Sequence, residues 1–504
     1  MRILVFHGYL LHGTGSNVYN ARLAEALVRA GNEVHLLCQD RDPFTLEWVD
    51  AVADWDGGEL EVSVRRDPVR ATVYRPDLGG LLPVYVADRY DGVWARPFPE
   101  LSDAEVEDYI ERNAAAVREV CARARPDVAL ANHLVMGPAV LARALGDDIP
   151  YAVKIHGSAL EYTVKPHPRF ERWAREGLAP ARGILVGSRH TGESLWAALA
   201  GDPSLRERTR LGPPGVDVEA FSPRAHPAAG LNALASRLAA LEPTSAGAAF
   251  ARDTRAAARA LTEVDGRLVV FVGKLIASKG VELLLAAWPL VAGEHPDARL
   301  VVVGFGAWRE GLESLAGQLA AGDLEGARAL RAEDGREPGE LAAFLDSLRG
   351  EERERYLAAA GALRDRVAFT GRLEHDELAD LLPAAEALVA PSTFPEAFGM
   401  VAAEGAAAGA LPIVARHSGL AEVSEALAER VPDAARAWLS FTVGPGAVIE
   451  LAACLNGWLG APQDVREATR EAIVAVTRER WSWDGVARTV LAAAQGQLDA
   501  LPHP

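Results

Sequence analysis

Two glutamates with seven residues between them mark the part of this chain best suited to chemistry. An Ala-rich run over 401–408 predicts a helix, with Glu396 in the loop before it and Glu404 about one turn inside. A helix start offers unpaired N–H groups to an anion, and Gly399 lets a ligand approach the backbone. This arrangement suits a sugar nucleotide, with phosphates at the amides and the carboxylates on sugar and ribose hydroxyls. A solvated acidic helix start is the alternative. The amides nearest the phosphates would be those of Phe398, Gly399, Met400 and Val401.

Two lysines flank a loop that a strand at 267–272 and a helix at 281–291 must position. Lys274 follows Gly273, and Lys279 precedes Gly280. An ammonium group is a compact donor that suits phosphate oxygens. Because the chain uses few lysines, two in one loop favour phosphate binding over a pair of surface lysines.

A glycine loop follows the first predicted strand, 2–6. Its residues Gly13, Gly15 and Ser16 could form a nest of backbone N–H groups for an anion. A dinucleotide fingerprint with Asp40 is the alternative. That motif needs a third glycine and a tighter turn after the strand, so the sequence disfavours it. A plain flexible loop remains open.

Other polar groups stand where predicted strands end, which is where ligand-carrying loops begin. His156 follows the strand 151–155 and could face a ligand, although a structural histidine bonded to backbone is the alternative. No G-x-S-x-G elbow supports a nucleophilic serine beside it. Three further candidates for donor binding also follow strands: Arg189, Gly306 and Arg372.

Bulk composition narrows the class of protein. The chain has 504 residues, a net charge of −18 and 49% hydrophobic residues. Its length predicts two or more domains, and its acidity argues against general nucleic-acid binding. Acidity also disfavours broad attraction to anionic lipid, although a local basic patch leaves room for peripheral membrane contact. Three scattered cysteines and no signal peptide or transmembrane run predict a cytoplasmic protein, and the heavy use of Ala, Gly and Arg suggests a bacterial source.

The strand and helix pattern predicts an α/β protein with two halves, each opening as strand, glycine loop and helix. The expected domains are 1–222 together with 478–504, and 266–477. We expect 223–265 to be a linker or insertion and 310–362 to be a helical insertion.

Taken in order, the motifs resemble the retaining glycosyltransferases of family 4, which have the GT-B fold of two Rossmann-like domains. The segment P-S-T-F-P-E-A-F-G-M-V-A-A-E-G at 391–405 is similar to the family's E-x7-E motif. Outside about 225–262 and 310–362 the resemblance covers nearly the whole chain. The other matching segments are the glycine loop at 13–16, H-G-S at 156–158, V-G-S-R at 186–189, P-G-V-D at 214–217, G-K-L-I-A-S-K-G at 273–280, V-V-V-G-F-G at 301–306 and T-G-R-L at 370–373.

The resemblance implies roles for these residues. Lys274 and Lys279 would hold the donor diphosphate, although the family usually has Arg where Lys274 stands. Glu404 would bind the ribose, Glu396 would orient the donor sugar, and His156 would lie near the transferred sugar. The C-terminal helix would pack back on the N-terminal domain, and no metal or other cofactor would be needed.

The leading hypothesis is therefore an enzyme that moves a sugar from a UDP-, GDP- or ADP-sugar to a hydroxyl acceptor. The alternatives are an NAD-type oxidoreductase and a non-catalytic sugar-nucleotide-binding protein. The segment 41–101 shows no acceptor signature, so lipid, polysaccharide and small-molecule acceptors stay open, as does the oligomeric state.

Overall fold

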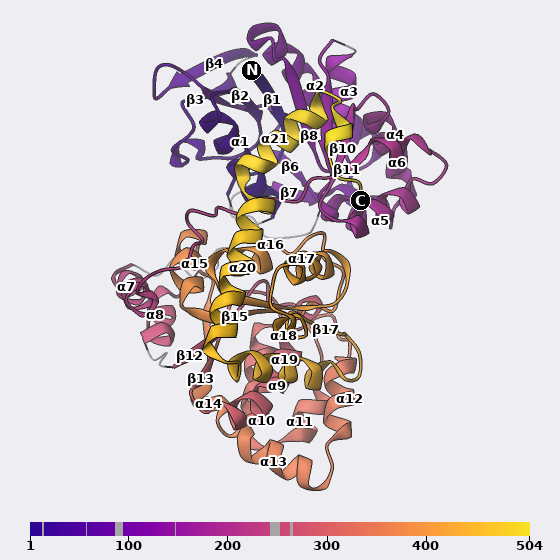
Figure 1. Cartoon of the computed structure of the whole chain (residues 1–504). Helices are drawn as coiled ribbons and strands as arrows, with labels where there is room; N and C mark the ends of the chain where they lie inside the picture. The colour runs from indigo at the N-terminus through magenta and orange to yellow at the C-terminus, as the bar shows by residue number, and fades with distance from the viewer. Residues whose placement is uncertain (13–14, 57, 86–93, 147, 242–251, 263–265) are drawn as a thin grey trace. The chain divides into compact units, whose positions relative to one another are not determined.

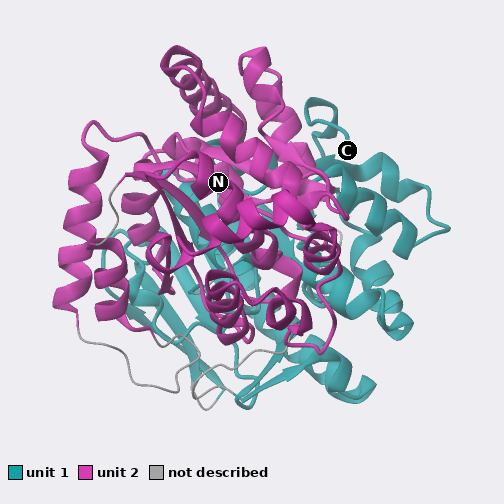
Figure 2. Cartoon of the chain, turned by 90° about the horizontal axis from the view of Figure 1, so that it is seen from below, with its two compact units in different colours: residues 1–215, 482–504 teal, residues 216–481 magenta. Residues whose placement is uncertain are grey.

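The computed structural model describes residues 1–12, 15–56, 58–85, 94–146, 148–241, 252–262 and 266–504. The chain forms two compact units, each with its own sheet and hydrophobic core (Figure 2). Unit 1 comprises 1–215 and 482–504, and unit 2 comprises 216–481.

The sheet of unit 1 has nine strands in the order β11-β10-β9-β8-β1-β2-β5-β3-β4 (Figure 1). All neighbours pair in parallel except β3 and β4. The predicted parallel sheet is therefore confirmed, with an antiparallel hairpin at one edge that the sequence reading missed. The strands are β1 (Arg2–Phe6), β2 (Glu33–Leu37), β3 (Ala51–Asp56), β4 (Glu59–Val64), β5 (Ala71–Arg75), β8 (Val128–Asn132), β9 (Tyr151–Lys154), β10 (Gly183–Val186) and β11 (Thr209–Leu211).

Helices of unit 1 are held by apolar residues at helical spacing. Leu23 and Leu27 of α1 and Val486 and Val490 of α21 are buried in one core with residues of the sheet. This packing confirms that the C-terminal helix returns to the N-terminal domain. A small parallel pair, β6 (Leu81–Val84) with β7 (Trp94–Pro97), completes the strands. The α-helices are α1 (Ser16–Arg29), α2 (Asp103–Ala124), α3 (Gly137–Leu145), α4 (Glu171–Leu178), α5 (Arg189–Ala198), α6 (Ser204–Arg208) and α21 (Trp483–Ala494).

The sheet of unit 2 has six strands, all parallel, in the order β14-β13-β12-β15-β16-β17. Apart from those of the edge strand β14, their apolar residues are almost all buried, as expected for a parallel sheet covered on both faces. The carboxyl ends of parallel strands meet at one edge, so the loops after β12, β15 and β16 become neighbours. The strands are β12 (Arg267–Val272), β13 (Ala298–Val303), β14 (Val367–Gly371), β15 (Ala385–Ala390), β16 (Leu411–Ala415) and β17 (Ser440–Phe441).

The described residues of the two segments expected as insertions are largely helical and belong to unit 2. Leu231, Leu234 and Leu238 of α7 share one hydrophobic core with the sheet, so this segment is packed into the unit. The helices of unit 2 are α7 (Pro227–Ala240), α8 (Thr254–Thr262), α9 (Val281–Glu294), α10 (Arg309–Ala321), α11 (Leu324–Ala329), α12 (Gly339–Ser347), α13 (Gly350–Ala360), α14 (Leu363–Arg366), α15 (His375–Leu381), α16 (Met400–Ala408), α17 (Ser418–Ala428), α18 (Asp433–Arg436), α19 (Ala447–Leu459) and α20 (Gln463–Trp481).

Cys38, Cys121 and Cys454 all carry free thiols. Among the helices that the structure describes, none is long and apolar enough to cross a membrane.

Candidate functional site

In unit 2 the structure brings Lys279 and Glu396 together, although they lie 117 positions apart in the sequence. Lys279 ends a short 3-10 helix, η5 (Ala277–Lys279), in the loop after β12. Glu396 lies in the loop between β15 and α16. Because β12 and β15 are neighbours in the sheet, the two loops meet, and Nζ of Lys279 donates to Oε1 of Glu396. Lys274 lies half-buried in the same loop as Lys279.

Polar groups from the loop after β15 and from the start of α17 hold Glu396 in place. The hydroxyl of Ser392 donates to Oε1 of Glu396 over 2.7 Å, and the backbone N–H of Glu396 donates to Oγ of Ser418 over 2.8 Å. Burial alone would raise the pKa of Glu396, but Lys279, the Ser392 hydroxyl and His417 together lower it below the ordinary value. The carboxylate is therefore ionised at neutral pH and can accept hydrogen bonds from hydroxyl groups.

His417 supports this arrangement from the start of α17. Its Nε2 lies 2.7 Å from the carbonyl oxygen of Ser392, and its Nδ1 lies 3.0 Å from the hydroxyl of Ser418. Since the carbonyl can only accept, Nε2 carries the proton and donates. His417 thus links Ser392 and Ser418, two of the residues that contact Glu396.

Glu404 projects from α16 one turn inside the helix, as the spacing predicts. Its side chain is buried, and Oε1 lies 3.6 Å from Nε2 of His375 at the start of α15. The ring of Phe221 packs edge-on against His375 at a centroid distance of 4.9 Å. Glu404 is therefore held beside an imidazole ring that can donate a hydrogen bond to it. This contact is separate from the ion pair of Lys279 and Glu396.

The start of α16 depends on Gly399. Its φ of 123° lies in a region that other residues rarely adopt, and a Cβ there would lie 2.7 Å from Cδ2 of Leu420. Phe398, one residue earlier, is buried. Its ring packs edge-on against that of Trp481, with the ring centroids 5.5 Å apart. Met400 and Val401 are the first two residues of the helix and are half-buried, so their N–H groups belong to the end that attracts anions.

We predict that Gly399→Ala lowers the free energy of unfolding by roughly 1–3 kcal/mol. Alanine would have to adopt the unfavourable φ, and its Cβ would clash with Leu420. Urea unfolding of the purified protein measures this loss. Gly317→Ala is the matched control: Gly317 lies within α10 with open space around its Cα. There the change should stabilise the helix by roughly 0.5–1 kcal/mol. Equal stability of Gly399→Ala and the unchanged protein would contradict the strain argument.

Two further predicted donor-binding residues lie on neighbouring loops of unit 2. Gly306 follows β13, and a Cβ there would come within 2.3 Å of the carbonyl oxygen of Leu275, so the loop that carries Lys274 can pack directly on it. Arg372 follows β14, is mostly buried, and forms an ion pair with Glu374 over 2.9 Å.

The remaining predicted residues belong to unit 1. His156 is half-buried after β9, and its Nε2 lies 2.9 Å from Oδ1 of Asn132. Gly15, with φ of 60°, precedes α1, and Ser16 is the first residue of that helix. Gly13 lies outside the described residues. Arg189 is an exposed residue in the first turn of α5, whose N-cap Ser188 accepts from the N–H of Thr191.

Sequence reasoning missed several residues that the structure places around these groups. In unit 2 they are Ser392, His417, Ser418 and His375. In unit 1 they are His7, Asn132 and His133. Ser392 and His417 come two residues after β15 and β16, whereas His7 and His133 come directly after β1 and β8. The position of a polar residue at a strand's carboxyl end was the signal that could have found them.

Family comparison matches both units. A sequence profile described as "Glycosyl transferase 4-like domain" matches residues 14–206, and one described as "Glycosyl transferases group 1" matches 254–323 and 343–431. The uncharacterized glycosyltransferase MJ1607 of Methanocaldococcus jannaschii is 30% identical over 159 residues, which are 32% of this chain and 30% of that protein. The chain spans less than half the length of the curated relatives it matches.

Solved structures show the same fold over nearly the whole chain. Sucrose-phosphate synthase from Thermosynechococcus elongatus is 19% identical with a TM-score of 0.57, covering 99% of both chains. Anabaena HepE in complex with UDP-glucose is 16% identical with a TM-score of 0.56, covering 98% of this chain and 99% of that one. Together with the two profiles, this likeness confirms the GT-B fold, and the chain belongs to the family 4-type glycosyltransferases.

Proposed function

We propose that this protein is a retaining, metal-independent glycosyltransferase. It moves a hexose from a UDP-, GDP- or ADP-sugar to a hydroxyl acceptor in the cytoplasm. The observation that carries the proposal is the half-buried pair of Lys279 and Glu396 near the N-terminal end of α16. A cation, a carboxylate and helix-start amides lie together there, and these are the groups that a sugar diphosphate needs.

Each group has a distinct task in this proposal. Lys279, with Lys274 on the same loop, takes the diphosphate, and the amides at the start of α16 add partial positive charge. Glu396 accepts from hydroxyls of the donor sugar, because its lowered pKa keeps it ionised. Glu404 accepts from the ribose hydroxyls.

The chemistry needs positive charge where the nucleotide leaves. Negative charge grows on the diphosphate as the bond to the sugar breaks, and a prepositioned ammonium group stabilises that charge. Lys279 and the α16 amides supply it from the protein, which is the support for metal independence. The acceptor would attack from the face that the nucleotide leaves, with the departing phosphate taking the proton, so no protein nucleophile is needed.

The comparisons support the donor class. The HepE structure holds UDP-glucose, and the glycosyltransferase profiles match both units. The free thiols of all three cysteines suit a reducing compartment.

Nucleotide binding tests the proposal first. We predict that one of UDP, GDP and ADP raises the melting temperature, because a ligand that binds only the folded protein stabilises it by about 2.7 kcal/mol at 100 times its Kd. The effect should disappear in Glu404→Ala. Thermal shift, with calorimetry on the responding nucleotide, measures both results.

Glu351→Ala is the matched control, since Glu351 is an exposed residue of unit 2 with its side chain 83% accessible. It should keep the full response.

A response to NADH instead of any diphosphate would favour an oxidoreductase. Binding of a nucleotide sugar with neither hydrolysis nor transfer would favour a non-catalytic binding protein.

A further inference from the structure

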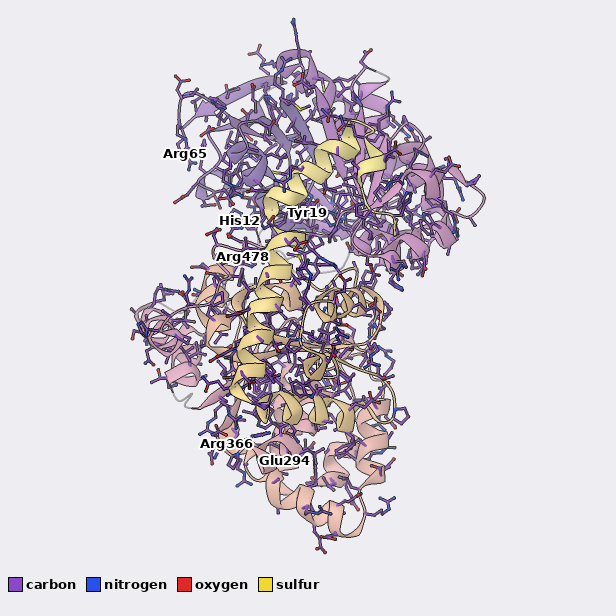
Figure 3. All side chains as sticks on the ribbon, in the orientation of Figure 1. His12, Tyr19, Arg65, Glu294, Arg366 and Arg478 are labelled. Atoms are coloured by element: carbon purple, nitrogen blue, oxygen red, sulfur yellow. The ribbon has the colours of Figure 1, made fainter. Side chains whose placement is uncertain are left out.

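Three histidines follow three neighbouring strands of unit 1. His7 comes directly after β1 and His133 directly after β8, and His156 comes two residues after β9. Their rings contact one another, with centroid distances of 5.8 Å from His7 to His133 and 4.8 Å from His133 to His156. Tyr19 of α1, labelled in Figure 3, packs edge-on against His156 at 5.0 Å. The strand order therefore gathers these side chains at one edge of the sheet.

The surroundings of His156 keep its ring neutral. Burial has the largest effect and lowers the pKa of His156 well below its ordinary value, and the basic groups of His133, Lys154 and His7 lower it further. Tyr19 faces the ring from α1 and stays protonated, because burial raises its pKa. A neutral imidazole has one N–H and one lone pair, so its function depends on which nitrogen carries the proton.

Asn132, the last residue of β8, determines which ring nitrogen of His156 carries the proton. Its Nδ2 donates to the carbonyl oxygen of Phe6 on β1 over 3.3 Å, which turns its Oδ1 toward His156. Nε2 of His156 lies 2.9 Å from that oxygen. An amide oxygen only accepts, so Nε2 must carry the proton and Nδ1 must hold the lone pair.

His133 does not compete for this role. Both of its ring nitrogens are buried without a hydrogen-bond partner in the part of the chain that the structure describes. It packs against His156 but does not hold its proton. Asn132 is thus the residue whose hydrogen bonds link His156 to the backbone of the neighbouring strand.

We propose that Asn132 is a positioning residue that fixes His156 as the Nε2–H tautomer, so that Nδ1 accepts a hydrogen bond from a substrate hydroxyl. This rests on the proposed function, which places His156 near the transferred sugar. Asn132 itself touches no substrate in this scheme and acts through the ring.

Nitrogen NMR of the full-length protein with 15N-labelled histidine tests the tautomer without any assay of transfer. His156→Gln identifies the signals of His156 by their loss. In the unchanged protein we expect Nε2 to be protonated and Nδ1 to be unprotonated at pH 7. In Asn132→Leu this single tautomer should give way to a mixture. A protonated Nδ1 in the unchanged protein, or an unaltered Nε2–H tautomer in Asn132→Leu, would overturn the proposal.

The pH dependence of sugar transfer then distinguishes a role of Asn132 in setting the protonation of His156 from a role in folding alone. In Asn132→Asp a carboxylate accepts from Nε2–H and favours the imidazolium, which has no lone pair at Nδ1. The acid limb of kcat/KM should therefore move upward by about one pH unit or more. Asn132→Leu should lower kcat/KM roughly tenfold or more, without that shift. An Asn132→Asp profile that coincides with that of the unchanged protein would contradict the proposal.

Asn113→Leu and Asn113→Asp are the matched controls. Asn113 is equally buried in unit 1, and its Nδ2 donates only to the carbonyl oxygen of Tyr109 within α2 among the hydrogen bonds of the described chain. These variants should leave the His156 tautomer and the pH profile unchanged. Full transfer by His156→Gln, with the tautomer as expected, would remove His156 from the proposed function. Asn132 would then still set the tautomer, but no substrate hydroxyl would depend on it.

Discussion

Lys279→Ala is expected to lower kcat/KM for sugar transfer by roughly 100-fold or more, a loss of about 3 kcal/mol in transition-state stabilisation. The ammonium group of Lys279, in the loop after β12, forms an ion pair with Glu396 in the loop before α16. Charge on the leaving diphosphate grows in the transition state, so the loss should appear mainly in kcat. Release of nucleoside diphosphate from UDP-, GDP- and ADP-sugars measures it, using whichever donor the unchanged protein consumes.

Lys165→Ala is the matched control for Lys279→Ala. Lys165 is an exposed lysine of unit 1 that also pairs with a glutamate, Glu161, and its loss should leave turnover unchanged. Urea unfolding of both variants is also needed, because Lys279→Ala leaves the carboxylate of Glu396 without its cation. A folded Lys279→Ala variant with nearly unchanged kcat/KM would remove Lys279 from the site.

The sequence could predict elements whose signal is local. The strands that became β1, β8 and β12 are apolar runs buried on both faces, and their bounds matched the structure. Strand β4 shows the opposite case. It is an edge strand in solvent, with Val62 and Val64 more than half exposed, so no buried face distinguished it from a loop.

The site depended on contacts that are not local. Lys279 and Glu396 could each be picked out from their own loops, but their pairing follows from the adjacency of β12 and β15. The order of the strands in the sheet cannot be predicted from any one segment of the chain. The contacts of Glu396 with Ser392 and Ser418, and of Glu404 with His375, have the same origin.

We expect a second large effect, on how stability depends on pH, from Glu282, the second residue of α9. It is 3% exposed, and its Oε2 has no hydrogen-bond partner in the described structure. The pKa of Glu282 is raised from an ordinary 4.5 to about 8, mainly by burial and to a smaller extent by the carboxylates of Glu340 and Glu333. The folded protein therefore holds a proton on Glu282 at neutral pH that the unfolded chain has released.

We predict that the free energy of unfolding falls as pH rises from about 4.5 to about 8, because the raised pKa makes deprotonation costly only in the folded state. At about 1.4 kcal/mol for each tenfold change in proton affinity, the full loss is roughly 5 kcal/mol. Glu282→Gln is neutral at every pH, so it should match the unchanged protein near pH 4.5 and exceed it in stability above pH 8. Urea unfolding across this range measures both curves.

Glu294→Gln is the matched control, since Glu294 ends the same helix and is exposed (Figure 3). Glu294→Gln should keep the pH dependence of the unchanged protein, because the change leaves Glu282 and its buried surroundings as they are. If Glu282→Gln also keeps that dependence, then Glu282 is ionised in the folded protein and water or a cation must reach it. If the dependence disappears, a protonated carboxyl lies three residues after Lys279, and the start of α9 carries no negative charge against the donor phosphates.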